Sequence, residues 1–172
     1  MSTERHSESS ESPTHSSLLK RVSPDLTTAG IVVSSETPVG ALPDAIASNR
    51  DCQTIAVVDA TGKLVGIIPV DTVIHYLLLH VLPGEFFAEV QELERAAELI
   101  KEQHAHTAGD LMHPPVSVPA GAAVREAFHL IHRAGLHGVP VVDEHEQVSG
   151  YIDLFRLLLA GLEKEPPPPA SR

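Results

Sequence analysis

One pattern of residues occurs twice in this chain. Residues 55–59, a short turn and residues 64–68 recur 84 positions later as residues 139–143, a second turn and residues 148–152. The matched positions include two aspartates, two glycines and two isoleucines: Asp59 and Asp143, Gly66 and Gly150, and Ile68 and Ile152. A repeat of this length indicates two similar supersecondary units that bury their apolar faces on each other. Two such units leave a pseudo-symmetric cleft between them, and small ligands bind in clefts of that kind.

Composition and charge exclude several classes of protein. The 172 residues carry a formal net charge of −11, and so acidic a surface repels the phosphates of nucleic acids. The single cysteine, Cys52, allows no internal disulfide and fits a reducing compartment. The longest apolar stretch, residues 73–82, is interrupted by two histidines and is shorter than the roughly 20 residues that span a bilayer. The N-terminus also lacks the basic and then apolar run of a signal peptide. We therefore expect a cytoplasmic protein with no nucleic-acid partner and no membrane insertion.

The chain is predicted to have five segments. Residues 1–17, rich in Ser, Glu and His, and residues 163–172, with four consecutive prolines, are predicted to be disordered tails. The two repeats cover residues 18–82 and 107–162. Residues 83–106 between them are predicted to form a connector helix, because five apolar residues follow alternating steps of four and three: Phe86, Val90, Leu93, Ala97 and Ile100. This stripe packs either on the protein's own body or on a partner.

Each repeat is predicted to contain a strand, a helix, two strands that form a hairpin, and a closing helix. In the first repeat these are a strand at 31–33, a helix, strands at 54–59 and 64–68, and a helix at 70–82. Thr37 and Pro38 are typical of a helix start, although Pro43 would then lie inside that helix. In the second repeat the elements are a strand at 116–118, a helix at 124–134, strands at 139–143 and 147–152, and a helix at 154–162.

Four short motifs of the second repeat together resemble a CBS domain, which is named after cystathionine β-synthase. They are residues 108–112, 116–118, 138–143 and 148–152. The first repeat is similar, with a weaker beginning in which Thr28-Ala-Gly30 matches Thr107-Ala-Gly109 but no Asp-Leu-Met follows. The resemblance covers residues 18–162 and implies an α/β fold, a tandem CBS pair whose two β-α-β-β-α units pack around a pseudo-twofold axis. It also implies that two chains associate into a flat disc and that the clefts bind adenosine nucleotides, whose presence regulates another protein.

The resemblance directs attention to the residues that follow each hairpin glycine. In nucleotide-binding members of the family, Ser or Thr often lies three residues after this glycine and Asp six residues after it. The corresponding residues here are Pro69 and Thr72 in the first repeat, and Asp153 and Arg156 in the second, so neither repeat has the pattern. Arg156 could bind phosphate through its forked guanidinium, whereas Asp153 would repel it. Asp153 is also typical of a helix N-cap, and the two residues, three positions apart, could simply pair with each other.

Other ligand contacts are expected from main-chain atoms at the start of each hairpin, because adenine is commonly recognised in this way in the family. Val33 and Val118, at the ends of the first strands, would line the same clefts, and Asp71 could substitute for the missing aspartate. The predicted ligand-binding residues are Val33, Thr54, Ile55, Asp71, Thr72, Val118, His137, Gly138, Val139, Asp153 and Arg156. The eleven histidines are interpreted as surface residues, and no metal site is predicted.

The sequence contains no catalytic constellation and no glycine-rich phosphate loop, so we expect no enzymatic activity. The predicted function is that of a stand-alone regulatory module that binds an adenosine-type ligand and signals to a separate effector protein. No cofactor is required; AMP, ADP, ATP or a related compound is the expected ligand, and a homodimer is the expected assembly. Two alternatives remain open: a ligand-free dimerisation or interaction module, and a sensor of divalent cations.

Overall fold

The computed structural model describes residues 21–81 and 104–162. Both predicted tails lie outside this part, and so do residues 18–20 at the beginning of the predicted first repeat. The predicted connector helix lies outside it as well, apart from residues 104–106, which form a turn and two residues without regular secondary structure rather than helix. Among the residues described, no helix combines the length and the apolar character that a membrane crossing requires.

Each repeat has the predicted order of elements. The first contains η1 (Pro24–Leu26), β1 (Ile31–Ser34), η2 (Val39–Ala41), α2 (Leu42–Ser48), β2 (Thr54–Val58), β3 (Leu64–Pro69) and α3 (Val70–Val81). The second contains α5 (Ala108–Leu111), β4 (Val118–Pro119), α6 (Val124–Arg133), β5 (Gly138–Val142), β6 (Val148–Asp153) and α7 (Leu154–Leu162). The prediction of a tandem pair of α/β units is therefore confirmed.

The first helix begins later than its sequence signal predicted. Pro38 precedes a short 3-10 helix, and α2 starts only at Leu42. This shift places Pro43 in the first turn of α2, where a backbone N–H has no helical partner to lose. Pro43 is therefore compatible with α2, whereas it would have lain inside a helix that began near Pro38 and would have disrupted it.

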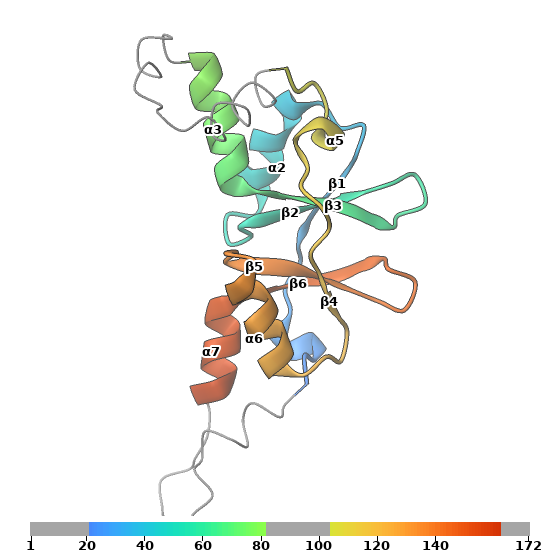
Figure 1. Cartoon of the computed structure of the whole chain (residues 1–172), viewed down its shortest axis with the longest axis vertical. Coiled ribbons are helices and arrows are strands. Elements are labelled where there is room, and N and C mark those ends of the chain that lie inside the picture. Colours follow the sequence, from blue (N-terminus) through green and yellow to red (C-terminus); the bar gives the residue numbers. More distant parts are fainter. Residues whose placement is uncertain (1–20, 82–103, 163–172) are drawn as a thin grey trace, which may run out of the picture.

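Two three-stranded sheets form the centre of the molecule. In each sheet the first and second strands are parallel and the second and third are antiparallel, in the orders β1-β2-β3 and β4-β5-β6. The parallel pairs require a crossover connection, which α2 and α6 provide. Figure 1 shows the two sheets facing each other, with α2 and α3 beyond one sheet and α6 and α7 beyond the other.

The two sheets are joined at their central strands. The Thr54 hydroxyl, at the start of β2, donates a hydrogen bond of 2.8 Å to the carbonyl oxygen of Gly138, at the start of β5. At the other end of these strands, Ala56 and Leu64 of the first repeat form an apolar cluster with Val142 of the second. These contacts lie close to the pseudo-twofold axis.

Each repeat also uses a segment that precedes the other repeat's strands. Val22 lies in the core of the second repeat, and Thr28 exchanges two backbone hydrogen bonds with Tyr151 of β6. The matching exchange joins His113, which precedes β4, to Ile67 of β3. The fold therefore interlocks the two repeats, because the free edge of each third strand is paired with a segment from the other half of the chain.

Candidate functional site

A cavity of about 460 Å³ opens between the two repeats. Its size is within the range of small-molecule sites. Residues on the first-repeat side are Thr28, Arg50, Asp51 and Gln53, and residues on the second-repeat side are Asp153, Phe155, Arg156 and Leu159. We call this cavity the inter-repeat cleft.

Asp153 and Arg156 form a fixed pair at the start of α7. One carboxylate oxygen of Asp153 accepts the backbone N–H of Arg156 at 2.8 Å, which is the N-cap interaction that the sequence indicated. The other oxygen lies 3.3 Å from Nε of Arg156, so the predicted side-chain pairing is confirmed as well. The pair holds the guanidinium at the cleft and offsets the charge of Asp153.

The opposite wall is the loop before β2. The backbone N–H of Gln53 donates to the Tyr151 hydroxyl at 3.1 Å, and its carbonyl oxygen accepts the N–H of Val70 at 3.0 Å. The Gln53 side chain donates to the carbonyl oxygen of Arg50 at 3.3 Å. These bonds fix the loop that presents Arg50 and Asp51 to the cleft.

Tyr151 connects this wall to the core. Its side chain is 1 % exposed and lies in the apolar cluster of the first repeat, although β6 belongs to the second. Burial disfavours the phenolate and raises the pKa of Tyr151 to about 12. The phenol therefore stays protonated, and its oxygen accepts the backbone N–H of Gln53.

The charges of the inter-repeat cleft balance. Arg50 and Arg156 contribute two positive charges, and Asp51 and Asp153 contribute two negative ones. Phe155 and Leu159 add apolar surface, and the Phe155 side chain is 68 % exposed. The cleft therefore offers guanidinium groups for an anion, carboxylate oxygens for hydroxyl donors, and an aromatic ring for a flat apolar group.

The cleft brings together only two of the eleven residues predicted from the sequence, Asp153 and Arg156. Ile55 and Val139 have fully buried side chains in the central strands, so the expected role of their main-chain atoms stays a prediction. Thr54 and Gly138 do not line the cleft; they form a hydrogen bond with each other across the repeats. Val33 is half-buried against the first core.

Three further predicted residues lie at positions related to the cleft by the repeat. Asp71 is exposed in the first turn of α3, and Thr72 is buried with its hydroxyl 3.4 Å from Nε2 of His113. The His137 side chain is exposed, and its carbonyl oxygen accepts the N–H of Leu154 at 2.8 Å, as Gln53 does for Val70. Val118 is buried in the second core and faces a different cavity, described below.

The sequence did not predict six of the residues that line the cleft. Two of them had a usable signal, because Gln53 and Phe155 are the repeat partners, 84 positions apart, of the predicted residues His137 and Asp71. The others are Thr28, Arg50, Asp51 and Leu159. They meet only because a loop of the first repeat faces a helix of the second, and no local pattern records that contact.

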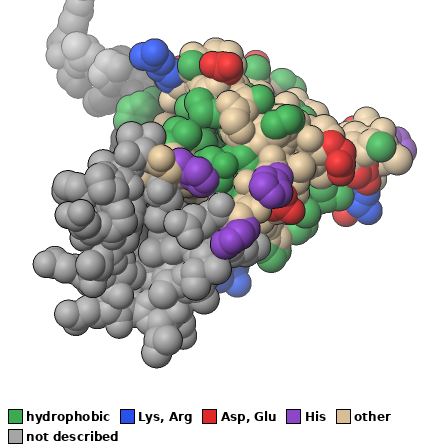
Figure 2. Space-filling view, turned by 90° about the horizontal axis from the view of Figure 1, so that it is seen from above, with side chains coloured by type: hydrophobic (Ala, Val, Ile, Leu, Met, Phe, Trp, Pro, Cys, Tyr) green, Lys and Arg blue, Asp and Glu red, His purple; other side chains and the backbone are tan. Residues whose placement is uncertain are grey.

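Histidines and the cysteine give no sign of metal or thiol chemistry in the part described. Figure 2 looks onto the end formed by the first repeat and shows histidines there beside hydrophobic side chains. Within residues 21–81 and 104–162, no group of three or more His, Cys, Asp or Glu side chains is arranged to hold a metal ion. Cys52 is buried, and burial raises the pKa of its thiol, which disfavours the reactive thiolate.

Comparison with solved structures shows close agreement in fold. A CBS domain-containing protein from Thermotoga maritima is 25% identical, with a TM-score of 0.64, covering 84% of this chain and 93% of that one. The CBS domain pair of protein MJ0100, solved with 5′-methylthioadenosine and S-adenosyl-L-methionine, is 20% identical, with a TM-score of 0.62 and coverages of 85% and 99%. CBSX2, a CBS-pair protein of Arabidopsis thaliana solved with AMP, is 21% identical, with a TM-score of 0.58 and coverages of 80% and 93%.

The family assignment rests on the sequence as well. No protein of curated function matches the chain in sequence. A sequence model of the CBS domain, however, matches residues 22–79 and again residues 108–163. These two matches coincide with the two interlocked α/β units of the structure. The chain therefore belongs to the CBS domain family and contains two CBS domains in tandem.

Proposed function

We propose that this CBS pair is a regulatory, non-catalytic module that binds an adenosine-type ligand in the inter-repeat cleft and signals its presence to a partner protein. The observation that carries the proposal is the fixed Asp153–Arg156 pair facing Arg50 and Gln53 across a cavity formed by both repeats. Ligand binding there would act on both repeats at once. CBSX2 with AMP and the MJ0100 domain pair with two adenosine compounds support this ligand class.

The charges of the cleft favour a particular kind of adenosine compound. Asp51 and Asp153 offset Arg50 and Arg156, so the cleft has little net charge with which to balance a triphosphate. One guanidinium suffices for a monophosphate, and a zwitterionic compound would need both signs of charge. We therefore expect AMP or S-adenosylmethionine to bind more tightly than metal-free ATP.

Calorimetric titration of the protein with AMP, S-adenosylmethionine and ATP tests this proposal. We expect saturable binding of at least one compound and a melting temperature that rises with its concentration. Arg156→Gln removes one of the two positive charges at the cleft and should weaken AMP binding about tenfold, which corresponds to a loss of roughly 1.4 kcal/mol of binding free energy. Lys63→Gln, which removes an exposed charge from the first hairpin, is the matched control and should leave affinity unchanged. Absence of binding by all three compounds would contradict the proposal.

We also propose that two copies associate through α3 and α7. Both helices expose large apolar side chains: Ile74, Leu77 and Leu78 on α3, and Phe155, Leu158 and Leu159 on α7. The two helices lie along the same side of the molecule (Figure 1). Phe155 and Leu159 also line the inter-repeat cleft, so ligand binding and association would affect each other. This surface equally supports the interaction-module function if no ligand binds.

Sedimentation equilibrium tests the association. Ile74→Glu and Leu158→Glu place a charge on each exposed face, so together they should convert a dimer into a monomer. The exposed Glu126→Gln variant on α6 is the control and should leave the assembly unchanged. A monomer in the unsubstituted protein, at every concentration and with AMP present, would refute the assembly.

A further inference from the structure

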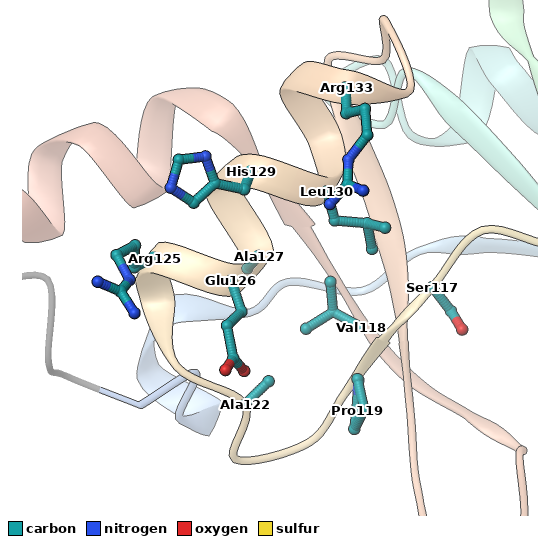
Figure 3. A pocket seen from close by; sticks show the side chains of 10 residues that line it. All are labelled: Ser117, Val118, Pro119, Ala122, Arg125, Glu126, Ala127, His129, Leu130 and Arg133. Atoms are coloured by element: carbon teal, nitrogen blue, oxygen red, sulfur yellow. The ribbon is translucent and has the colours of Figure 1, made fainter.

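A second cavity lies away from the inter-repeat cleft, on the second repeat. Its volume is about 540 Å³, and it is bounded by α6 and by the segment 117–122, which contains β4. It shares no lining residue with the inter-repeat cleft. Figure 3 shows its lining side chains arising from these two segments. We call it the α6 cavity.

The inner wall of the α6 cavity is apolar. Val118 and Ala127 are buried in the core of the second repeat, and Leu130 is half-buried against it. Pro119 completes the wall from β4 and has no N–H to offer. A ligand body that covers this wall gains the free energy of burying apolar surface.

Basic residues form the outer part of the cavity. Arg125, His129 and Arg133 are four residues apart along α6, so they follow one stripe of the helix. In Figure 3 the Arg133 side chain extends along Leu130 toward Val118, whereas Arg125 and His129 project from the far side of α6. Among the residues that the structure describes, neither arginine has an ion-pair partner, although the chain carries a net charge of −11.

Residues 21 and 22, which precede the strands of the first repeat, hold the facing segment in position. The N–H of Val22 donates to the carbonyl oxygen of Ala122 at 2.7 Å, and the N–H of Gly121 donates back to Val22 at 3.1 Å. The Arg21 guanidinium also donates to the carbonyl oxygen of Gly121 at 2.8 Å. These three bonds make the α6 cavity a pre-formed feature, which lowers the cost of ordering a site when a ligand binds.

We propose that the α6 cavity binds a small organic anion, a carboxylate or a phosphate ester attached to an apolar body of about one ring. The Arg133 guanidinium binds the anionic group through forked hydrogen bonds, and the body covers Val118 and Leu130. Arg125 lies two turns from Arg133, about 12 Å along the helix, so one compact anion meets only one of them. Glu126 disfavours a second anionic group at the other end of the cavity.

Titration of the ¹⁵N-labelled protein with benzoate, phenyl phosphate, benzyl alcohol and inorganic phosphate tests the proposal by NMR. We expect benzoate or phenyl phosphate to cause saturable shifts in the backbone amides of Val118, Ala122, Ala127 and Leu130. The tighter of the two probes identifies the anionic group. Benzyl alcohol lacks the charge and inorganic phosphate lacks the body, so both should bind at least tenfold more weakly. Equal binding by either of these, or no saturable shift at the four amides, would overturn the proposal.

One substitution connects the binding to Arg133. Arg133→Gln should weaken benzoate or phenyl phosphate about tenfold, because it removes the charge and keeps a hydrogen-bond donor. The residue is exposed in the last turn of α6, so the melting temperature should change little. Lys63→Gln again controls for net charge. Unchanged affinity in the Arg133 variant, with the four amides still shifting, would show that the arginine does not bind the anion and would refute this site.

Discussion

Thr54→Val tests whether the hydrogen bond between the repeats stabilises the fold. Thr54 is 1 % exposed, and its hydroxyl donates to the Gly138 carbonyl oxygen at 2.8 Å. Valine has nearly the shape of threonine, so the substitution removes the donor and fills the same space. A second variant, Thr54→Ser, keeps the donor and removes the methyl group.

The magnitude follows from the burial of both groups. Leaving a buried carbonyl oxygen without its donor costs about 1–3 kcal/mol. The added methyl group of valine recovers less than about 1 kcal/mol by burying apolar surface. We therefore expect Thr54→Val to lower the free energy of unfolding by about 1–2 kcal/mol, or the melting temperature by about 3–8 °C. Thr54→Ser should cost about 1 kcal/mol through the small cavity that it leaves.

Urea denaturation followed by circular dichroism measures both variants against the unsubstituted protein. The dependence on urea concentration should be unchanged, so that the shift in midpoint reports stability alone. The sign of the valine effect decides the outcome. If the hydroxyl contributed only its volume, valine would be neutral or stabilising while serine remained destabilising, and that result would refute the reasoning.

Three further predictions follow from the close contacts and the titrating groups. Gly66→Val should prevent stable folding, because a Cβ there would lie 2.9 Å from the carbonyl oxygen of His113. Gly40→Ala should fold normally, because its Cβ would meet no atom within 4 Å apart from the adjoining backbone, and circular dichroism after expression distinguishes the two variants. Burial raises the pKa of Tyr151 to about 12, so the stability it contributes is present below its unfolded pKa of about 10 and is lost as the pH rises through 12. The difference in tyrosinate absorbance between the protein and a Tyr151→Phe variant isolates this phenol and should titrate near pH 12, and a difference that titrates near pH 10 in the folded protein would contradict this. Backbone N–H groups of Gln147 and His145 lower the pKa of Asp143, so the stability that its carboxylate contributes is present above about pH 4 and is lost as the pH falls through the lower folded pKa. Asp143→Asn should therefore make the free energy of unfolding depend less on pH in the acid range. An unchanged acid denaturation profile would argue against this role of Asp143.

The sequence predicted the elements well because their signals are local. Alternating and continuous apolar runs with an Asp at the turn predict the hairpins, and Asp59 and Asp143 indeed accept backbone N–H groups in those turns. Thr37 and Pro38 predicted too early a start for the first helix, because they precede a short 3-10 helix, and α2 begins only at Leu42 with Pro43 in its first turn. The family resemblance then fixed how the elements assemble.

The candidate site could be predicted only where counting from a hairpin glycine of the repeat led to a residue that lines the cleft. Counting from Gly150 located Asp153 and Arg156, and both line the inter-repeat cleft. Arg50 and Asp51 had no such reference, because they line the cleft only where segments about 100 residues apart meet. The burial of Thr54 was likewise beyond reach, since its hydrogen bond crosses from one repeat to the other.

The sequence by itself therefore determined the two β-α-β-β-α units, their hairpins and their membership of the CBS family, since spacing and apolar periodicity act within a few residues of each position. Only the tertiary structure decided that the segment with Val22 completes the second core and that Tyr151 completes the first. It also decided that a basic stripe of α6 borders a cavity rather than only solvent. The physical reason is that such contacts depend on how whole units pack, and packing across the pseudo-twofold axis requires only apolar surfaces that fit, which many different residues can supply.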